Sequence, residues 1–379
     1  MSEHAQPLAD PGGERHKIGV LPSQALVRLI QGGAIKAAER IGDEQIQPAS
    51  LDLRLGARAY RVRASFLPGR SATVMQRVAK FAMHEIDIEN GAVLEKGCVY
   101  IVPLMESLQL RDDCTALGNP KSSTGRLDIF TRIITDGGNE FDRVRAGYSG
   151  PLYAEIAPRT FSILVRKGSR LSQLRVRRGV PVHSDEEHKR LQEQHRVIDA
   201  PLADEDIKNG VPISVDLQGR RDSRLIGYRA KSHAGLIDVD KKGYYAVADF
   251  WEPVYSRNGD GLILDPGEFY ILASKEAVRI PVSYAAEMIA YDTLVGEFRV
   301  HYAGFFDPGF GDPQAGGEGA RAVLEVRSFE VPFVIEHGQI VGRLVYEPLT
   351  ETPEKIYGHG MKSHYQRQGL QLSKHFRAG

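Results

Sequence analysis

Most of the chain consists of short runs in which apolar and polar residues alternate. Residues 46–63 (IQPASLDLRLGARAYRVR) follow the period-two pattern of a half-buried strand. Similar runs, each ended by Gly or Pro, continue to about residue 182, and they read VLEKGCVYIVPL, RLDIFTRII, GPLYAEIAP, FSILVRKG and RLSQLRVRRG. Many short strands with turn residues between them, and almost no helix, predict an all-β sandwich or barrel-like domain.

Two segments have the pattern of helices instead. Residues 21–35 (LPSQALVRLIQGGAI) predict a short amphipathic helix with Ser23 as its N-cap. Residues 184–206 are charged and rich in helix formers, and Ser184 and Glu187 have the spacing of a capping box. Because this charged segment separates two strand-rich regions, we interpret it as a helical linker.

The second half of the chain repeats the first. Residues 93–110 (VLEKGCVYIVPLMESLQL) align without a gap on residues 263–280 (ILDPGEFYILASKEAVRI), and farther on in the same register Glu155 falls on Glu325. Strand-like runs of the second half include YYAVADFW and LILDPGEFYILA. The repeat predicts two copies of one domain, each with the same carboxylate. We expect an N-terminal domain over 1–183, a linker over 184–207 and a C-terminal domain over 208–379.

Composition narrows the class of protein. The 49 basic residues balance 49 acidic ones, so no net charge attracts the chain to nucleic acid or to a membrane. No apolar run is long enough to span a bilayer, and residues 1–17 lack the apolar segment of a signal peptide. The two cysteines, Cys98 and Cys114, suit a reducing compartment and exclude a metal site made of several cysteines. We therefore expect a cytoplasmic protein.

Residues 121–155 carry the candidate chemistry of the first copy. They open with a turn that contains Ser122, Ser123 and Arg126, and they close with Glu155 inside an apolar run. Hydroxyl groups donate hydrogen bonds to phosphate oxygens and a guanidinium adds a charged fork, so such a turn can bind phosphate. A carboxylate held among apolar residues can move protons. Taken alone, the segment is more often an ordinary turn than a phosphate site.

Taken in order, four motifs resemble those of the dCTP deaminases, relatives of the trimeric dUTPases. The Arg-Ser-Ser-x-x-Arg segment of that family is matched by residues 120–126 (PKSSTGR), with Lys121 in place of the leading Arg. The family's Ile-Asp-Pro-Gly hairpin is matched by residues 304–311 (GFFDPGFG), its Leu-Glu pair by residues 323–326 (VLEV) and its tail by residues 364–369 (HYQRQG). The resemblance implies a mainly β fold with two tandem dUTPase-like domains, each a distorted β-barrel or jelly roll (β-clip), joined by the helical linker.

The motifs are divided unevenly between the two copies. The first copy keeps the phosphate turn and Glu155, but Arg145 stands where the family's hairpin has Asp. The second copy keeps Asp307 and Glu325, whereas Asp292 stands in its phosphate turn, where it would repel a triphosphate. We therefore favour one composite site, with the turn from the first copy and the hairpin, the acid and the tail from the second. The alternative is a self-sufficient first copy in which Glu155 is the acid.

The resemblance implies the hydrolytic deamination of dCTP to dUTP and ammonia, within the supply of pyrimidine deoxynucleotides for dUTP and dTTP. Glu325 or Glu155 would exchange protons with the attacking water, and Ser122 and Arg126 would hold phosphate or polarise that water. Further contacts to the nucleotide are implied for Lys121, Ser123, Asp307, Phe310, Val323, Tyr357, Gln366 and Gln368. Because sites in this superfamily lie between neighbouring domains, a homo-oligomer is also implied.

The sequence contains no motif of a zinc-dependent deaminase. Zinc-dependent cytidine deaminases use a His-x-Glu motif or its Cys counterpart together with a Cys-x-x-Cys motif. No His here is followed two residues later by Glu, and Cys98 and Cys114 are too far apart for the second motif. The resemblance implies a zinc-free route in which Mg²⁺ arrives with the triphosphate and is held chiefly by phosphate oxygens.

Other interpretations of the same residues stay open. A dUTP diphosphatase, alone or combined with deamination, would activate water at the α-phosphate, although the apolar setting of Glu325 favours the deaminase. A non-catalytic nucleotide-binding protein would explain why each copy has lost part of a site. For Glu325 itself, the alternative is a structural residue that faces solvent or pairs with a neighbour such as Arg327.

Overall fold

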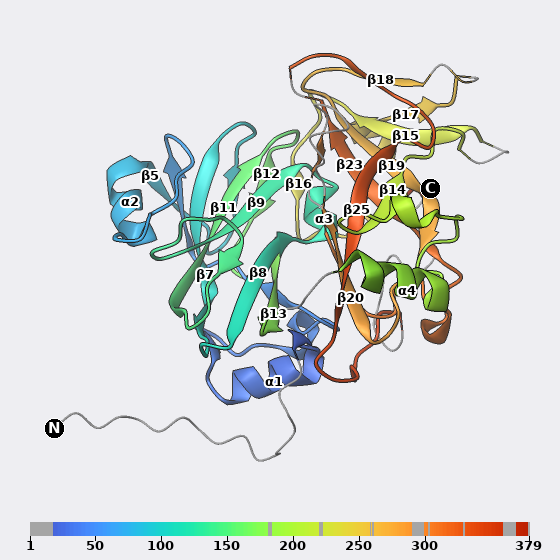
Figure 1. Ribbon diagram of the computed structural model, residues 1–379. Coiled ribbons are helices and arrows are strands. Elements are labelled where there is room, and N and C mark those ends of the chain that lie inside the picture. Colours follow the sequence, from blue (N-terminus) through green and yellow to red (C-terminus); the bar gives the residue numbers. More distant parts are fainter. Residues whose placement is uncertain are drawn as a thin grey trace.

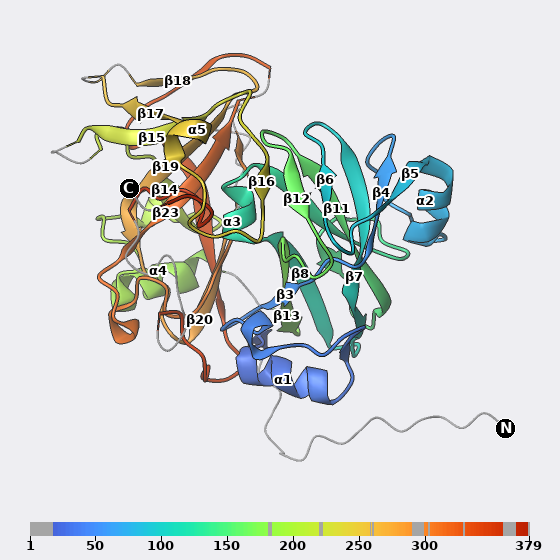
Figure 2. The same cartoon turned by 180° about the vertical axis from the view of Figure 1, so that it is seen from behind.

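The computed structural model describes residues 18–180, 184–219, 223–257, 259, 261–289, 299–301, 304–328, 330–358 and 369–377. Strands dominate, and the two halves of the chain form two β-rich units that lie side by side (Figure 1). The view from behind shows the same two units, with the helix of residues 23–31 beneath them (Figure 2). The predicted mainly β architecture is confirmed. Within the described residues, no helix is long and apolar enough to cross a membrane.

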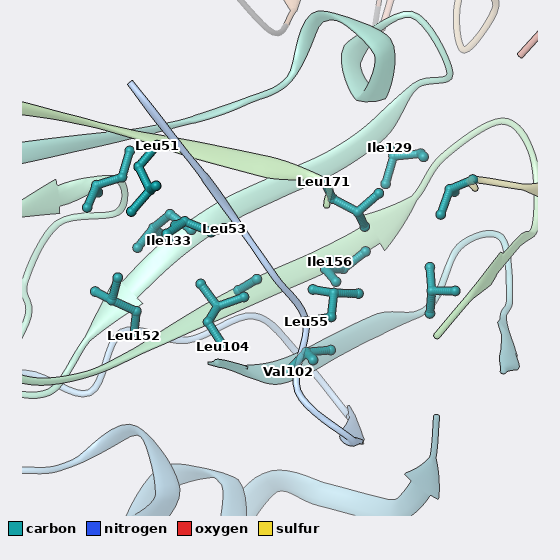
Figure 3. Close-up of a cluster of buried hydrophobic side chains, with 14 of the residues drawn as sticks. Leu51, Leu53, Leu55, Val102, Leu104, Ile129, Ile133, Leu152, Ile156 and Leu171 are labelled. Atoms are coloured by element: carbon teal, nitrogen blue, oxygen red, sulfur yellow. The ribbon is translucent and has the colours of Figure 1, made fainter. Parts of the chain in front are cut away.

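The first unit is built from two sheets of antiparallel strands. The larger sheet has the order β5 (Ala82–Asp87), β4 (Arg58–Val62), β7 (Val99–Gln109), β11 (Ser149–Pro158) and β9 (Ile129–Thr135), with β2 (Ile35–Ala37) also paired to β7. The other sheet has the order β1 (Gly19–Val20), β13 (Ser172–Arg178), β8 (Cys114–Pro120) and β10 (Arg143–Val144), with β3 (Leu51–Leu53) also paired to β13. Apolar side chains of β3, β7, β9 and β11 meet in the core between the sheets (Figure 3).

The second unit has the same arrangement. Its larger sheet has the order β17 (Trp251–Tyr255), β15 (Leu225–Ala230), β19 (Phe269–Val278), β23 (Ala320–Arg327) and β21 (Arg299–His301). Its other sheet has the order β14 (Val211–Ser214), β25 (Ile340–Pro348), β20 (Tyr284–Ile289) and β22 (Phe305–Phe306). In the first unit Glu155 lies opposite Ile101, and in the second Glu325 lies opposite Ile271. Both partners are displaced by the same 170 residues, so the register read from the sequence recurs in the strand pairing.

The helices agree only partly with the sequence pattern. Helix α1 (Ser23–Gln31) begins one residue earlier than predicted, because Pro22 is its N-cap and Ser23 makes no capping bond. Ser23 as the N-cap was therefore wrong, and its hydroxyl instead donates to Gln24. Helix α4 (Asp185–His195) lies within the predicted linker, and the Ser184 hydroxyl accepts a hydrogen bond from the Glu187 N–H at 3.2 Å.

Helices α2 (Val74–Phe81) and α5 (Val247–Phe250) were not predicted as helix. Helix α2 is capped by Thr73 and Gln76, which bond to each other's backbone N–H groups in a capping box. That spacing is visible in the sequence as a start signal for a helix. The YYAVADFW segment was predicted to be a strand, and this was wrong for most of it: it forms α5, and only Tyr245, in an isolated bridge, and Trp251, where β17 begins, have strand pairing. The turn buries Phe250 against the edge of the Phe161 ring at 5.6 Å, so tertiary packing decides its conformation.

The two units share one cluster of buried apolar side chains. One buried cluster contains side chains of both halves, among them Leu127, Ile129 and Phe161 from the first and Trp251, Ile271 and Val323 from the second. A short strand of the second half, β16 (Ile237–Asp238), also extends a small sheet of the first half by pairing in parallel with β12 (Ile163–Val165), which pairs with β6 (Ala92–Leu94). The corresponding β18 (Leu262–Leu264) and β24 (Phe333–Ile335) pair with each other in the second unit. Burial of apolar surface between the units fixes their relative position.

The C-terminal segment, residues 369–377, returns to the first unit. The Ser373 hydroxyl donates to the carbonyl oxygen of Ser123 at 2.8 Å, and the Arg126 guanidinium donates to the carbonyl oxygen of Gln371 at 3.1 Å. The Gly243 N–H donates to the carbonyl oxygen of Lys374 at 2.9 Å. Residues 369–377 therefore lie against the predicted phosphate turn.

Candidate functional site

The predicted phosphate turn forms a single helical turn, α3 (Ser122–Gly125), directly after strand β8. Ser123 and Arg126 are buried, whereas Ser122 is partly exposed. The preceding Lys121 pairs its ammonium with the buried carboxylate of Asp52, and Arg170 lies 3.8 Å from the same carboxylate. Cations and hydroxyls thus gather around this turn, as a bound phosphate chain would require.

Glu325 lies in the interior strand β23 of the second unit and is 3% exposed. Burial raises the pKa of its carboxyl well above the usual range, the positive charge of Arg126 opposes that rise, and the negative charge of Asp128 adds to it. Arg126 and Asp128 directly follow the phosphate turn of the first unit, and Asp128 forms an ion pair with Arg327, two residues after Glu325 on β23. The structure therefore brings that turn and Glu325 together within one chain. No described basic side chain forms an ion pair with Glu325 within 4.0 Å.

Arg327 is not the partner of Glu325. Its guanidinium binds the Asp128 carboxylate and donates to the Thr160 hydroxyl at 2.9 Å, so it joins the two units instead. Thr160 in turn donates to Asp128 at 2.5 Å. The carboxylate of Asp128 is only 1% exposed, which makes this a buried ion pair between the units.

Asp307 lies in the hairpin of the second unit and faces the first unit. Its side chain is 12% exposed and its carboxylate is 3.8 Å from the Arg175 guanidinium. Burial raises the pKa of Asp307 to about 6, although the charges of Arg175 and Lys121 favour the ionised form; the negative charge of Asp52 adds to the rise. Charged side chains of the first unit, including Lys121 directly before the phosphate turn, therefore act on Asp307 in the hairpin of the second unit.

Arg175 holds that hairpin in place. Its side chain is fully buried in β13 and donates hydrogen bonds to the carbonyl oxygens of Ala286 at 2.9 Å and Phe306 at 3.1 Å. Its guanidinium carbon lies 4.0 Å from the centre of the Phe305 ring. A first-unit cation therefore binds the backbone of β22, directly before Asp307, and of the paired strand β20, which makes Arg175 a positioning residue for Asp307.

Aromatic side chains surround the hairpin. Phe310 is buried, and its ring lies 5.3 Å from that of Phe306 and 5.5 Å from that of Tyr357. The Tyr357 N–H donates to the carbonyl oxygen of Pro308 at 2.9 Å. Val323 belongs to the buried cluster shared by the two units. Two predicted contact residues, Gln366 and Gln368, and residues 291–296, which include Asp292, lie outside the described residues.

Glu155 has a different environment from Glu325, although both lie at the same strand position. Its carboxylate is 1% exposed and accepts two hydrogen bonds from Arg132, at 2.6 Å and 3.1 Å. The Arg132 guanidinium is also held over the rings of Phe141, at 3.4 Å, and Phe130, at 4.5 Å. Glu155 is thus neutralised inside the first unit, whereas Glu325 faces the phosphate turn of the other unit.

Replacement of Glu155 by glutamine should destabilise the first unit without removing the chemistry of the site. The change leaves the partly buried Arg132 charge without its carboxylate, which should lower the free energy of unfolding by about 1–3 kcal/mol. Urea unfolding followed by circular dichroism measures this change. An unchanged unfolding midpoint would contradict a structural role for the pair, and the double variant Glu155→Gln/Arg132→Met serves as the control because it removes both charges.

Sequence reasoning missed three residues that the structure places around the site. Arg175 and Asp128 act between the units, and their partners lie more than 100 residues away along the chain. The third is Lys374 of the returning C-terminal segment, whose pKa is lowered to about 8 by burial and by the nearby charges of Lys121 and Lys242. The basic character of the C-terminal sequence was the one available signal. Among the described residues, no three or more His, Cys, Asp or Glu side chains are grouped to hold a metal ion.

Models of one protein family match nearly the whole chain. Residues 17–180 match the N-terminal domain of 2'-deoxycytidine 5'-triphosphate deaminase, and residues 184–376 match the C-terminal domain of the same family. The crystal structure of 2'-deoxycytidine 5'-triphosphate deaminase from Agrobacterium tumefaciens is 57% identical in sequence, with a TM-score of 0.83. The match covers 88% of this chain and 99% of that one.

Curated relatives align with about half of the chain. A protein of Methanobrevibacter smithii named dCTP deaminase, dUMP-forming, is 28% identical over 189 residues, which are 49% of this chain and 90% of the relative. A protein of Haloarcula marismortui named dCTP deaminase is 30% identical over 196 residues, which are 50% of this chain and 93% of the relative. Of these two names, only that of the Methanobrevibacter smithii relative states a product, dUMP.

Proposed function

Because this chain belongs to the 2'-deoxycytidine 5'-triphosphate deaminase family, we propose that it hydrolyses dCTP to dUTP and ammonia. The family resemblance seen in the motifs is confirmed by these matches. One observation supports the proposal above all others: the buried carboxyl of Glu325 lies within the electrostatic influence of Arg126, at the phosphate turn of the other unit. The proposed site is therefore a single one, formed by both halves of the chain.

The phosphate chain of the substrate would lie at α3. Ser122 and Ser123 supply hydroxyls there, and Lys121 and Lys374 supply cations. Burial lowers the pKa of Lys374 to about 8, and the nearby charges of Lys121 and Lys242 add to this shift; an incoming triphosphate would favour the charged ammonium. We propose that dCTP enters as its Mg²⁺ complex, with the ion held chiefly by the phosphate oxygens of the substrate. Gln366 and Gln368 would close over the same phosphates.

The base would lie between Glu325 and the hairpin of the second unit. Phe310 and Tyr357 supply aromatic surface beside Asp307, and Asp307 accepts a hydrogen bond from the sugar hydroxyl. Val323, two residues before Glu325 on β23, supplies an apolar surface on the same side of the strand. Because Arg175 holds the hairpin from the first unit, the base-binding and phosphate-binding parts keep a fixed separation.

The chemistry requires one group that accepts and then returns a proton. The Glu325 carboxylate takes a proton from water as the oxygen of that water forms a bond to C4 of the cytosine ring, and it passes this proton to N3. Glu325 then takes the remaining proton of the new hydroxyl and delivers it to the amino group. The C4–N4 bond breaks, a C4 carbonyl forms, and ammonia leaves. The carboxylate ends in the state in which it began, and water supplies both protons and the oxygen.

The environment of Glu325 suits both steps. Burial raises its pKa, which makes the carboxylate a stronger base than an exposed glutamate. The Arg126 charge opposes this rise and favours the ionised form that begins the reaction. Arg126 can also polarise the attacking water, since its guanidinium is fixed by its hydrogen bond to the Gln371 carbonyl oxygen.

Incubation of the purified protein with dCTP and Mg²⁺ tests the proposal. We expect ammonia and dUTP to appear in equal amounts, with ammonia measured by a coupled assay and nucleotides by ion-exchange chromatography. Reactions with dCMP and CTP serve as controls for the phosphate chain and for the sugar. If dCTP binds but releases no ammonia, the deaminase proposal fails and the protein is a nucleotide-binding protein without this activity.

The name of the Methanobrevibacter smithii relative favours a second candidate, a bifunctional enzyme that also removes diphosphate. In that case dUMP and diphosphate would replace dUTP as products in the same chromatogram. Added dUTP would then disappear when dCTP is left out. Accumulated dUTP that persists through a long incubation would rule out the bifunctional enzyme.

A further inference from the structure

A positively charged cavity lies mainly in the first unit. It has a volume of about 850 Å³ and is bordered by strands β8 and β10, the loop after β9 and the end of β13, and Glu347 on β25 of the second unit also lines it. None of the residues proposed for catalysis or substrate binding lines it. It is therefore separate from the composite site, and its volume is within the range of sites that bind small molecules.

Four arginines give the cavity its charge: Arg70, Arg143, Arg145 and Arg177. Two carboxylates line it as well. Glu347 pairs with Arg177 at 2.7 Å, and Glu140 lies 3.8 Å from Arg143.

Arg70 and Arg145 lack such neutralisation. Among the described residues, neither has a carboxylate within 4.0 Å, and both side chains are exposed. The cavity therefore keeps an excess of positive charge.

The backbone places Arg70 and Arg145 on either side of a glycine turn. The Gly137 N–H donates to the Ala72 carbonyl oxygen at 3.0 Å, and the Gly69 N–H donates to the Gly138 carbonyl oxygen at 3.1 Å, so the two loops hold each other. A Cβ at Gly137 would lie 3.5 Å from the Arg70 carbonyl oxygen and 4.0 Å from the Arg145 guanidinium. Gly137 has a φ of +69°, which also favours glycine at this position.

We propose that this cavity binds the phosphate chain of a second ligand, an oligophosphate, with Arg70, Arg143 and Arg145 as its ligands. Guanidinium groups bind phosphate oxygens through paired N–H donors, and several of them on one side of a cavity match a chain of two or three phosphates. The chain can be free or can belong to a nucleotide. Leu117 and Val180 supply an apolar wall on the side toward β8 and β13, where a base would fit.

Arg145 shows that this cavity and the composite site suit different ligand groups. It occupies the hairpin position that Asp307 occupies in the second unit, so the sign of the charge is reversed at corresponding positions of the two copies. Asp307 is held beside the cations Arg175 and Lys121 of the first unit. A cation cannot replace it there, but the same cation at an open cavity attracts phosphate.

Binding of inorganic tripolyphosphate, followed by isothermal titration calorimetry, tests the proposal. The parent protein for this experiment carries Ser122→Asp, which weakens phosphate binding at α3 and reproduces the acidic residue that the second copy has at that position. We expect this parent to retain one binding site for tripolyphosphate. Adding Arg145→Glu should weaken that site at least about tenfold, and adding Arg70→Glu as well should abolish it.

Two control variants accompany the series. Arg40→Glu makes the same charge change at an exposed arginine that does not line the cavity, and it should leave the affinity within about twofold. Arg145→Lys keeps the charge but removes the paired donors, and it should have an intermediate affinity. Circular dichroism checks that each variant is folded, which the exposure of Arg70 and Arg145 favours.

The results separate the proposal from its alternatives. A parent without any tripolyphosphate site, or a site that Arg145→Glu leaves unchanged, overturns it. If nucleoside triphosphates bind the parent more than tenfold tighter than tripolyphosphate, and Arg145→Glu weakens them, the natural ligand is a nucleotide. Equal affinities that depend on Arg145 would support an inorganic oligophosphate. Because only binding is measured, the outcome does not depend on the deaminase activity.

Discussion

Glu325→Gln should lower kcat for dCTP deamination by about 10²–10⁴-fold while leaving the affinity for dCTP nearly unchanged. Glutamine has the shape of glutamate and fits the same buried position on β23, but it cannot accept a proton from water or return one to the leaving amine. The phosphate turn and the hairpin are not altered by the change. Single-turnover ammonia release and dCTP titration measure the two quantities separately.

The matched control is Glu155→Gln, because Glu155 occupies the same strand position in the first unit. Its carboxylate is bound by Arg132, so we expect this variant to keep kcat close to that of the wild type. Loss of activity in Glu155→Gln, with full activity in Glu325→Gln, would move the chemistry to the first unit. Full activity in both variants would contradict a role for either carboxylate.

The pH dependence of the wild type gives a second readout of the same group. Glu325 must be ionised to take the proton from water, so kcat/KM should rise about tenfold per pH unit below the pKa of the free enzyme and level off above it. Because burial raises that pKa, the bend should lie above the range of an exposed glutamate. A bend near the value of an exposed glutamate would contradict a buried base.

Asp128→Asn should be the most destabilising single change in the interface between the units, by about 3–5 kcal/mol. The Asp128 carboxylate and the Arg327 guanidinium are both buried, and removing the negative charge leaves the positive one without compensation. Asparagine tolerates the left-handed backbone of this position, where φ is +55°, so the change isolates the charge from backbone strain. Urea unfolding followed by circular dichroism measures the loss.

The double variant Asp128→Asn/Arg327→Met is the control for this prediction. Because methionine fills much of the space of arginine without its charge, the double variant should be more stable than Asp128→Asn alone. Asp128→Asn should also lower the pKa of Glu325, since the Asp128 charge contributes to its rise, and the bend in kcat/KM should move to lower pH. If Asp128→Asn unfolds at the same urea concentration as the wild type, the ion pair does not hold the units together.

The strands could be predicted from the sequence because the alternation of apolar and polar residues is a local pattern. Period-two alternation in residues 46–63 and the runs that follow it predicted strands such as β4, β7 and β11. The helical turn at residues 247–250 was not accessible, because aromatic contacts with Phe161 and Phe376 override the strand-like composition. Helix α2 was missed although Thr73 and Gln76 carry a start signal, because a run of strands made helix less expected there.

Only part of the candidate site could be predicted from the sequence. The order of the motifs named Ser122, Arg126, Asp307 and Glu325, and the uneven division between the copies suggested that one site is shared. The sequence did not show whether Glu155 or Glu325 is the acid of the site. The two differ because Arg132, on the neighbouring strand β9, forms an ion pair with Glu155. The sequence also did not reveal Arg175, whose hydrogen bonds join residues more than 100 positions apart. Long-range ion pairs and hydrogen bonds leave no periodic trace in a sequence.

Mixing two inactive variants tests most directly whether one chain forms the composite site from its own two halves. Arg126→Ala removes a part that the first half supplies, and Glu325→Gln removes the acid that the second half supplies. Each variant is assayed alone and in an equimolar mixture after refolding together, with ammonia release from dCTP by the wild type as the reference. If both parts come from the same chain, the mixture stays as inactive as either variant. Recovery of activity in the mixture would contradict this, because the turn and the acid would then come from different chains.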